Sequence, residues 1–550
     1  MRLRAFLLFT VSGAALAQPS ISYRGIVNSA NYAGSGLPSG GVAQGSLFSI
    51  FGSSLGPSPG VSAPGYPIGA SLQGISIQLT QGATQLPVYP LYVSAGQINA
   101  IMPSNAPLGT DIIQVMVNGQ PSNLAPVKVV SSAFGLYSAS GTGSGPGGIQ
   151  NFVAKGVPPT NSTQAAAAPG SILILYGTGL GPIAAPDNEP PPVGDLSVPL
   201  QVFVGGVSAT VAYAGRAPCC AGEDQITITV PANAPQGCWV PVYLTAGGVT
   251  SNAVTAAIGN PGTCSDAGNP LAKAFIKGGN LGSLRLIRSN TYQNIAILQP
   301  GAVSTDVFTR EFSTVEGGPF VFSPLFSQPP PGSCTLFFTP NSFWSSSGGF
   351  SAPTTITAAL DAGATFSLNG NGTTTALTPA AGYGAVPLGS SATTLPTIAN
   401  HLVLNPGNYT LSAPGGANVH PFQVKLSMPQ PFVWNEQQTL NVVTRSGGLT
   451  VTWSGLPAGQ SMSIQGGNAD LPSNSSAIFY CVAPPNATSF TIPASILAAV
   501  PATRSDDRKS KGMIYLMNSS PGNGVPVTAE GLDAAVAVPM YLFGKTVVFQ

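Results

Sequence analysis

The sequence predicts an all-β protein built of tandem immunoglobulin-like β-sandwich domains, and three observations lead to this prediction. The 550 residues include 68 glycines and 53 prolines but only 6% charged side chains, while 43% are hydrophobic. A set of motifs recurs at a nearly constant offset, which indicates a duplicated domain. Apolar and polar residues alternate over short runs that end in glycine, proline or asparagine turns, a pattern typical of strands.

The composition limits the class of protein. A chain of 550 residues is too long for one domain and suggests three or four. Its hydrophobic content argues against disorder, and its glycines and prolines lack the three-residue period of collagen. The net charge of +1 offers no electrostatic attraction to nucleic acid, so we expect no nucleic-acid partner.

The N-terminus reads as a signal peptide. Residues 1–17 contain two arginines, an apolar stretch and the A-x-A cleavage site Ala15-Leu16-Ala17. The apolar run is too short to span a bilayer, and no later stretch is long and apolar enough. We therefore expect cleavage near Ala17 and a secreted or cell-surface protein without a membrane span.

The cysteines suit an oxidising compartment, and we expect disulfides at Cys219, Cys220, Cys238, Cys264, Cys334 and Cys481. Because neighbouring cysteines rarely bond each other, Cys219 and Cys220 are each expected to pair with one of the next two cysteines, in either order. Cys334 would then pair with Cys481 by elimination. We expect no metal or cofactor, because the adjacent pair lacks the C-x2-C spacing of zinc sites and both histidines lie far away.

The internal repeat is the most informative signal. Residues 45–57 read GSLFSIFGSSLGP and residues 170–182 read GSILILYGTGLGP, at an offset of 125. Gln97-Ile98-Asn99 corresponds to Gln225-Ile226-Thr227 at an offset of 128, and Ser122-Asn123 to Ser251-Asn252 at 129. Each copy has about 100 residues with some seven short strands, which fits an immunoglobulin-like sandwich.

The second copy carries an insertion. Tyr92 and Tyr213 correspond at an offset of 121, so about seven extra residues precede Gln225. These are residues 216–222, which include the adjacent cysteines. We expect the insertion to be a disulfide staple added to the second copy.

The repeated motifs resemble those of a group of uncharacterised secreted acidobacterial proteins with paired IPT/TIG-like, that is immunoglobulin-like, β-sandwich domains. The resemblance rests on G-S-x-x-x-[FY]-G-x-x-L-G-P, Y-V-S-x-x-Q-I-N-x-x-x-P and the S-N-x-V-T of residues 251–255. It covers about residues 22–260 and implies fold and export but no activity. The chain departs from the usual arrangement, because nearly 290 residues follow the paired domains.

The resulting domain prediction has six parts. They are a signal peptide (1–17), a first sandwich (18–132), a linker (133–168), a second sandwich with the disulfide insertion (169–260), a linker or irregular β segment (261–330), and a C-terminal β-sandwich region of one or two units (331–550).

Candidate catalytic residues are few. Ser54 fits the G-x-S-x-G pattern of hydrolases, but the second copy has Gly179 at the serine position and no helix is expected to follow. His401 and His420 are expected to be surface or structural residues. The sequence therefore predicts no catalytic residue.

Candidate binding residues are also ambiguous. The four tryptophans could stack on sugar rings but are more often core residues: they are Trp239, Trp344, Trp434 and Trp453. Glu223-Asp224 and Asp506-Asp507 could seed a calcium site, but adjacent carboxylates on a strand point to opposite faces. Solvated loops are the expected setting for both pairs.

The sequence thus predicts a secreted or cell-surface protein that binds, adheres or builds the envelope without catalysis. Two alternatives stay open, a carbohydrate-binding extracellular protein and a hydrolase with an unrecognised site. The expected partner is an extracellular ligand, with glycans and surface proteins as the candidates.

Overall fold

The computed structural model is dominated by strands and confirms the predicted fold class, an all-β protein of tandem immunoglobulin-like β-sandwich domains. The predicted signal peptide, Trp344 and Asp506-Asp507 lie outside the described residues. The structure describes residues 18–293, 301–324, 326–340, 356–379, 385–391, 401–504 and 512–550. None of the helices in these ranges is long and apolar enough to cross a membrane.

The first sandwich closes around its own apolar core. Its strands follow the order β1-β3-β8-β7-β6-β9-β11-β2, and the long β7 pairs with β6 up to Val88 and with β8 from Tyr89 onward. Strand β7 therefore takes part in both of the sheets that form the sandwich, the one with β6 and the one with β8. The strands are β1 (Ser20–Asn28), β2 (Val42–Ala43), β3 (Leu47–Ser53), β4 (Val61–Ser62), β5 (Ser71–Leu72), β6 (Ile75–Gln81), β7 (Thr84–Val93), β8 (Gln97–Ile101), β9 (Gly109–Val117), β10 (Gln120–Pro121) and β11 (Ala125–Val130).

The second sandwich repeats this plan in the order β12-β14-β17-β16-β15-β18-β19, with β13 on β14 and β20 on β18. Its β16 pairs with β15 up to Ala209 and with β17 from Thr210 onward, as β7 does in the first copy. The strands are β12 (Gly135–Leu136), β13 (Ile149–Asn151), β14 (Ile172–Thr178), β15 (Leu200–Val204), β16 (Val207–Arg216), β17 (Asp224–Thr229), β18 (Gly237–Ala246), β19 (Val249–Thr250) and β20 (Val254–Ile258).

Residues 133–168, expected to be a linker, instead supply β12 and β13 to the second sandwich. Strand β12 shows no hydrophobic periodicity in the sequence. Small residues are needed there, because the backbones of β12 and β14 approach each other closely. A Cβ on Gly177 of β14 would lie 2.2 Å from the carbonyl oxygen of Gly135 in β12. In the first copy, a Cβ on Gly52 would lie 2.1 Å from the carbonyl oxygen of Ser20.

The recurring Ser-Asn pair fastens this first strand in both copies. The Oδ1 of Asn123 accepts a hydrogen bond from the N–H of Ile21 at 2.7 Å, and that of Asn252 accepts one from the N–H of Leu136 at 2.8 Å. Each amide also donates to the carbonyl of the same partner, at 3.2 Å and 2.9 Å. The motif therefore acts as a side-chain extension of the sheet.

The C-terminal unit is built on an 11-stranded sheet in the order β23-β34-β33-β36-β38-β21-β22-β24, with β27 on β22 and with β31 and β37 on β38. Its strands are β21 (Gly279–Gln293), β22 (Gly301–Val315), β23 (Ser333–Pro340), β24 (Ile356–Ala359), β27 (Ala385–Ser390), β31 (Val442–Val443), β33 (Ser463–Asp470), β34 (Ser475–Val482), β36 (Gly512–Met517), β37 (Val525–Pro526) and β38 (Ala534–Phe549).

Residues 261–330, expected to be a linker or irregular, instead contain α1 (Ala272–Lys277) and the long strands β21 and β22. Strand β21 lies in the middle of the large sheet, where it pairs in parallel with β38 from the far end of the chain. Its sequence, GNLGSLRLIRSNTYQ, mixes polar and apolar residues, and its apolar residues serve two clusters: Leu284 and Leu286 pack in one and Leu281 in the other.

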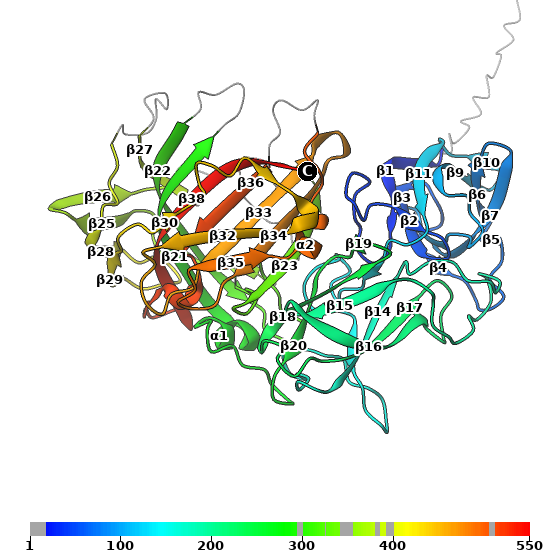
Figure 1. The fold of residues 1–550 in the computed structure, drawn as a ribbon, viewed down its shortest axis with the longest axis horizontal. Coiled ribbons are helices and arrows are strands. Elements are labelled where there is room, and N and C mark those ends of the chain that lie inside the picture. The colour runs from blue at the N-terminus through cyan, green and yellow to red at the C-terminus, as the bar shows by residue number, and fades with distance from the viewer. Residues whose placement is uncertain are drawn as a thin grey trace, which may run out of the picture.

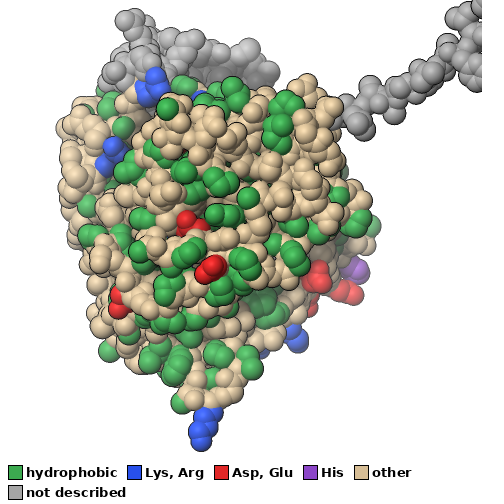
Figure 2. All heavy atoms as spheres, turned by 90° about the vertical axis from the view of Figure 1, so that its right-hand side faces the viewer, with side chains coloured by type: hydrophobic (Ala, Val, Ile, Leu, Met, Phe, Trp, Pro, Cys, Tyr) green, Lys and Arg blue, Asp and Glu red, His purple; other side chains and the backbone are tan. Residues whose placement is uncertain are grey.

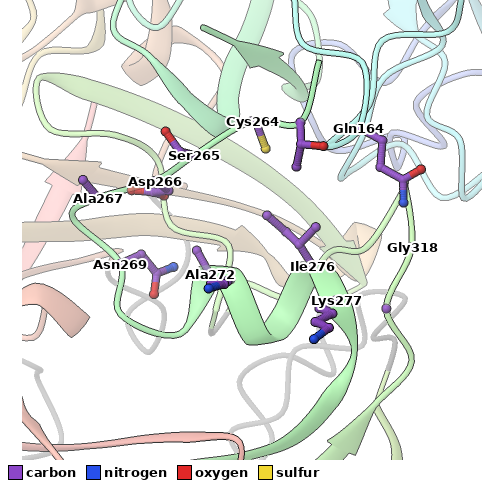
Figure 3. A pocket seen from close by; sticks show the side chains of 13 residues that line it. Gln164, Cys264, Ser265, Asp266, Ala267, Asn269, Ala272, Ile276, Lys277 and Gly318 are labelled. Atoms are coloured by element: carbon purple, nitrogen blue, oxygen red, sulfur yellow. The ribbon is translucent and has the colours of Figure 1, made fainter. Parts of the chain in front are cut away.

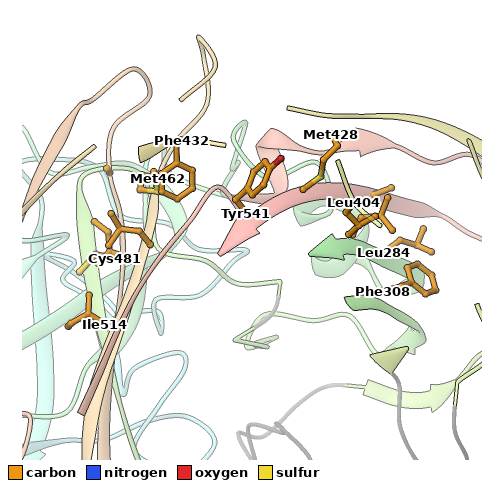
Figure 4. Packing of buried hydrophobic residues seen from close by; sticks show 14 of the residues in the cluster. Leu284, Phe308, Leu404, Met428, Phe432, Met462, Cys481, Ile514 and Tyr541 are labelled. Carbon is orange, nitrogen blue, oxygen red and sulfur yellow. The ribbon is translucent and has the colours of Figure 1, made fainter. Parts of the chain in front are cut away.

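One core ties residues 331–550 to strands β21 and β22. The large sheet packs against a four-stranded sheet and a three-stranded sheet, and a continuous apolar cluster joins Leu284, Phe308, Met428, Ile514 and Tyr541 (Figure 4). The smaller sheets contain β25 (Phe366–Gly370), β26 (Thr373–Leu377), β28 (Gly407–Ala413) and β29 (Phe422–Met428), then β30 (Val433–Trp434), β32 (Leu449–Ser454) and β35 (Ser489–Ile492). The short helix α2 (Ala494–Ala498) follows β35.

The three units touch one another (Figure 1). The indole Nε1 of Trp239 in the second sandwich donates to the carbonyl of Val321 at 3.0 Å. The hydroxyl of Thr250 donates to the carbonyl of Ser495 in α2 at 2.7 Å. The first sandwich reaches the C-terminal unit through the loop after β1, where Ala33 packs in a cluster with other buried apolar residues of both units.

Candidate functional site

The expected pairing of Cys219 and Cys220 is wrong, because these two cysteines bond each other, with Cα atoms 3.7 Å apart. Cys238 pairs with Cys264 instead. The reason is where the insertion lies: it is held against the first sandwich, whereas Cys238 and Cys264 belong to an apolar cluster shared with the C-terminal unit. Cys334 and Cys481 join β23 to β34, the pairing expected by elimination.

The insertion of the second copy docks onto the first copy. The hydroxyl of Tyr66 accepts a hydrogen bond from the N–H of Ala221 at 2.8 Å and donates to the carbonyl of Cys219 at 3.4 Å. Ala221 is buried in a small apolar cluster with Ile68 and Ile101 of the first sandwich. The insertion therefore joins the two copies rather than bracing the second copy alone.

A buried ion pair completes this junction. The guanidinium of Arg216 pairs with Asp224 and donates to the carbonyl of Gly45 at 2.8 Å and of Gly181 at 2.6 Å. Arg216 and Asp224 are both almost fully buried. Burial of a charge is costly unless it is paired and hydrogen-bonded, so this arginine fixes one carbonyl from each copy in place.

The candidate catalytic residues do not assemble. Ser54 lies in a turn of the first sandwich, whereas both histidines lie in the C-terminal unit. The Nδ1 of His420 lies 3.0 Å from the Oε2 of Glu530, and both side chains are exposed. In the ranges that the structure covers, no three His, Cys, Asp or Glu side chains gather where they could hold a metal ion.

The tryptophans within the described residues are core residues. Trp239, Trp434 and Trp453 have 1–3% of their surface exposed and cannot stack on a ligand. Asp224 also serves the structure, because its Oδ2 accepts hydrogen bonds from the N–H groups of Gly179 and Leu180, both at 2.8 Å. The Glu223-Asp224 pair is therefore not a solvated loop.

A pocket of about 810 Å3 lies beside α1, where the second sandwich meets the C-terminal unit (Figure 3). Ala272 and Ile276 of α1 form an apolar wall, and Lys273, Lys277 and Asp266 bring charge to the rim. Burial raises the pKa of Asp266, and a hydrogen bond from the N–H of Gly268 partly opposes that rise. A glycosidase needs a pair of carboxyl groups, and among the residues that line this pocket only Asp266 carries one.

A second pocket of about 430 Å3, here called the tyrosine pocket, lies between the first sandwich and the segment that opens the second. Three aromatic side chains line it, those of Tyr32, Tyr92 and Tyr137. Its polar lining consists of uncharged side chains: Ser29, Ser62, Asn99 and Ser138. The pocket therefore offers aromatic surface and hydrogen-bonding groups without a formal charge.

The surface around the two sandwiches has the same character. Figure 2 shows this side of the molecule, where charged side chains are few and scattered among hydrophobic and uncharged polar ones. This agrees with the 6% charged residues of the whole chain. This surface therefore offers apolar area and neutral hydrogen-bonding groups rather than a strong long-range electrostatic field.

No protein-family model and no curated protein matches the chain. Among solved structures it resembles the plexin A4 extracellular region, with 13% identity, 46% of this chain and 19% of that chain covered, and a TM-score of 0.17. It also resembles a Bacteroides ovatus SGBP-B in complex with mixed-linkage heptasaccharide, with 12% identity, 86% of this chain and 90% of that chain covered, and a TM-score of 0.13. The surface layer protein SbsC, domains 4–9, shares 10% identity, with 96% of this chain and 65% of that chain covered and a TM-score of 0.17. The chain thus spans about a fifth of the plexin chain, and likenesses this weak carry no functional argument.

The tyrosine pocket was not predictable from the sequence, because its residues come from distant parts of the chain. Tyr92 and Asn99 lie within the repeated motif Y-V-S-x-x-Q-I-N, so part of the signal was visible. Tyr32 and Tyr137 lie outside the motifs, and Tyr137 falls in residues 133–168, the predicted linker. Only the docking of the two copies brings the three rings together.

Proposed function

We propose that the chain is a secreted or cell-surface binding protein without catalytic activity, with a role in adhesion or envelope architecture. The observation that carries this proposal is the docked pair of sandwiches, joined by the buried Arg216–Asp224 ion pair and by the insertion. A rigid β scaffold that presents pockets and loops is the usual basis of extracellular recognition. Cleavage near Ala17 and kinship with IPT/TIG-like secreted proteins are part of the same proposal.

Export is supported by the chemistry of the cysteines. All three disulfides need an oxidising compartment to form and persist. Absence of catalysis is supported by the separation of Ser54 from both histidines and by the single carboxyl group in the pocket beside α1.

The proposal is tested on the exported chain beginning at Gln18, with its disulfides intact. We expect the folded protein to bind washed cell envelopes or isolated envelope polymers in a saturable manner, and to leave a broad panel of ester, peptide and glycoside substrates unchanged. Turnover of any of these substrates, or folded protein that binds no envelope fraction, would contradict it.

A further inference from the structure

The tyrosine pocket is built by rigid parts of two units. Strands β3, β4, β7 and β8 of the first sandwich supply one side, and the loop after β12 supplies Tyr137 and Ser138. Ser138 Oγ accepts hydrogen bonds from the N–H of Thr142 at 3.1 Å and of Gly143 at 2.9 Å, which fixes this loop. The pocket is therefore formed before any ligand arrives, as most small-ligand sites are.

Tyr32 is held in an unusual backbone conformation. Its φ is +52°, a region that bulky residues rarely adopt and that often marks functional sites. The turn around it is fixed by the buried amide of Asn28, whose Oδ1 accepts from the N–H of Ala30 at 2.8 Å. The Nδ2 of Asn28 donates to the carbonyls of Ala133 and Thr178, both at 3.1 Å. The docked second copy thus sets the conformation that places Tyr32 at the pocket.

Tyr92 reaches the pocket through a β-bulge. The register between β7 and β8 shifts between Pro90 and Tyr92, so Leu91 has no partner in β8. A bulge re-aims the side chains around it, and here the consecutive residues Leu91 and Tyr92 both line the pocket.

The polar groups of the pocket are positioned and partly unused. The Oδ1 of Asn99 accepts from Gln97 Nε2 at 2.7 Å and from Ser49 Oγ at 2.9 Å, so the side chain has a defined orientation. Within the described residues, the Nδ2 of Asn99 and the hydroxyl of Ser62 make no hydrogen bond. These two groups are available to a ligand.

The hydroxyls of Tyr32 and Tyr137 stay neutral. Burial raises the pKa of Tyr32 and of Tyr137, and the carboxylate of Glu223 raises the latter further. The rings therefore offer neutral faces and neutral donors.

We infer that the tyrosine pocket binds a neutral pyranose unit of a glycan. A pyranose ring presents an apolar C–H face that packs on aromatic rings, and a rim of hydroxyls that pair with amide and hydroxyl groups. The pocket offers these two kinds of surface, and none of the side chains that line it is charged. The inference rests on the proposed binding function and gives it a site and a ligand class.

The test titrates the full exported chain with neutral oligosaccharides of glucose, galactose, mannose and xylose, followed by saturation-transfer NMR and calorimetry. Tyr32→Asn removes the ring while keeping a residue that tolerates positive φ. Tyr92→Ala removes a second ring, and Tyr92→Phe keeps it. Tyr23→Ala, at a tyrosine with 85% of its surface exposed and outside the pocket, is the matched control.

We expect at least one oligosaccharide to bind, with affinity reduced about tenfold or more by Tyr32→Asn and by Tyr92→Ala, a loss of about 1.4 kcal/mol each. Tyr92→Phe and Tyr23→Ala are expected to change it less than about threefold. If every oligosaccharide fails to bind, or if both ring deletions leave affinity unchanged in folded protein, the inference is overturned. Binding of these same variants to cell envelopes reports separately on the proposed function, because adhesion through another surface survives loss of the pocket.

Discussion

The two sandwich copies share strand order and bulge but use their equivalent residues differently. In both, the long central strand shifts register one residue before a tyrosine, Tyr92 in the first copy and Tyr213 in the second. The hydroxyl of Tyr213 donates to the carbonyl of Arg216 at 2.7 Å, at the start of the insertion. Tyr92 lines the tyrosine pocket instead.

The two copies also use equivalent residues differently at the start of the next strand. Asp224 occupies the position of Gly96, and its buried carboxylate anchors Arg216 against both copies. The first copy has no ionisable group at this position. Duplication thus gave two scaffolds, and the insertion made the second one the docking half while leaving the first free to form a pocket.

The largest difference between the copies is expected at the buried ion pair. Asp224→Ala leaves Arg216 buried without its partner and removes the acceptor of two backbone N–H groups. Breaking such a pair costs about 3–5 kcal/mol. Gly96→Ala, at the matching position of the first copy, is expected to cost less than about 1 kcal/mol, because the nearest atom to the new Cβ is 3.9 Å away. Urea unfolding of both variants measures this, and equal costs would contradict the division of roles.

The next largest contrast is expected between the stability contributions of the Cys238–Cys264 and Cys219–Cys220 disulfides. Replacing Cys238 and Cys264 by alanine opens a loop with a sequence separation of 26, which is expected to cost about 3 kcal/mol. Replacing Cys219 and Cys220 opens no loop of comparable size, since they are adjacent, and should change the free energy of unfolding by less than about 1 kcal/mol. Chemical denaturation under non-reducing conditions measures both free energies of unfolding. A larger loss of stability for the adjacent pair would show that the insertion stabilises the fold in another way.

A smaller contrast is expected in the repeated Ser-Asn motif. Asn252 is buried and also donates to the carbonyl of Gly143 at 2.7 Å, whereas Asn123 is exposed. Asn252→Ala should cost about 1–3 kcal/mol, because it leaves buried backbone groups unsatisfied. Asn123→Ala should cost less than half as much, since water replaces the lost amide. Thermal unfolding of the two variants measures both losses of stability, and a larger loss for Asn123→Ala would contradict this expectation.

The smallest effect is a pH dependence in the second copy. Burial, followed by the charge of Asp224, raises the pKa of Glu223 above its ordinary value. The native state therefore binds a proton that the unfolded chain has released, so stability should fall as pH rises from the ordinary glutamate value through the raised one. Glu223→Gln should flatten this slope in midpoints measured between about pH 4 and pH 7. The same change at the exposed Glu189 should leave the slope as it is, and an unchanged slope in Glu223→Gln would exclude this origin.

The sequence predicted the features that depend on local pattern. Strands β9 and β10 flank the turn Asn118-Gly119, and β15 and β16 flank Gly205-Gly206, as alternation and turn residues indicate. The all-β class follows from the same signals, and the duplication follows from the repeated motifs.

Features that depend on distant contacts were not predictable. Strand β12 is too short and too small in its residues to show periodicity, and β21 owes its central place to β38, about 250 residues later. The disulfide pairing depends on which unit each cysteine faces, and the tyrosine pocket depends on how the copies dock. These are tertiary facts that local pattern does not encode.

We expect the insertion to make the two sandwiches one rigid body that holds the tyrosine pocket. The most direct test places spin labels on the exposed positions of Gln78→Cys and Gln201→Cys, one in each copy, in the full disulfide-intact chain. The described cysteines are all disulfide-bonded, so only the new thiols react. We predict one narrow distance distribution that broadens when residues 217–222 are deleted. A broad distribution in the otherwise unaltered chain, as for domains on a flexible tether, would contradict the claim.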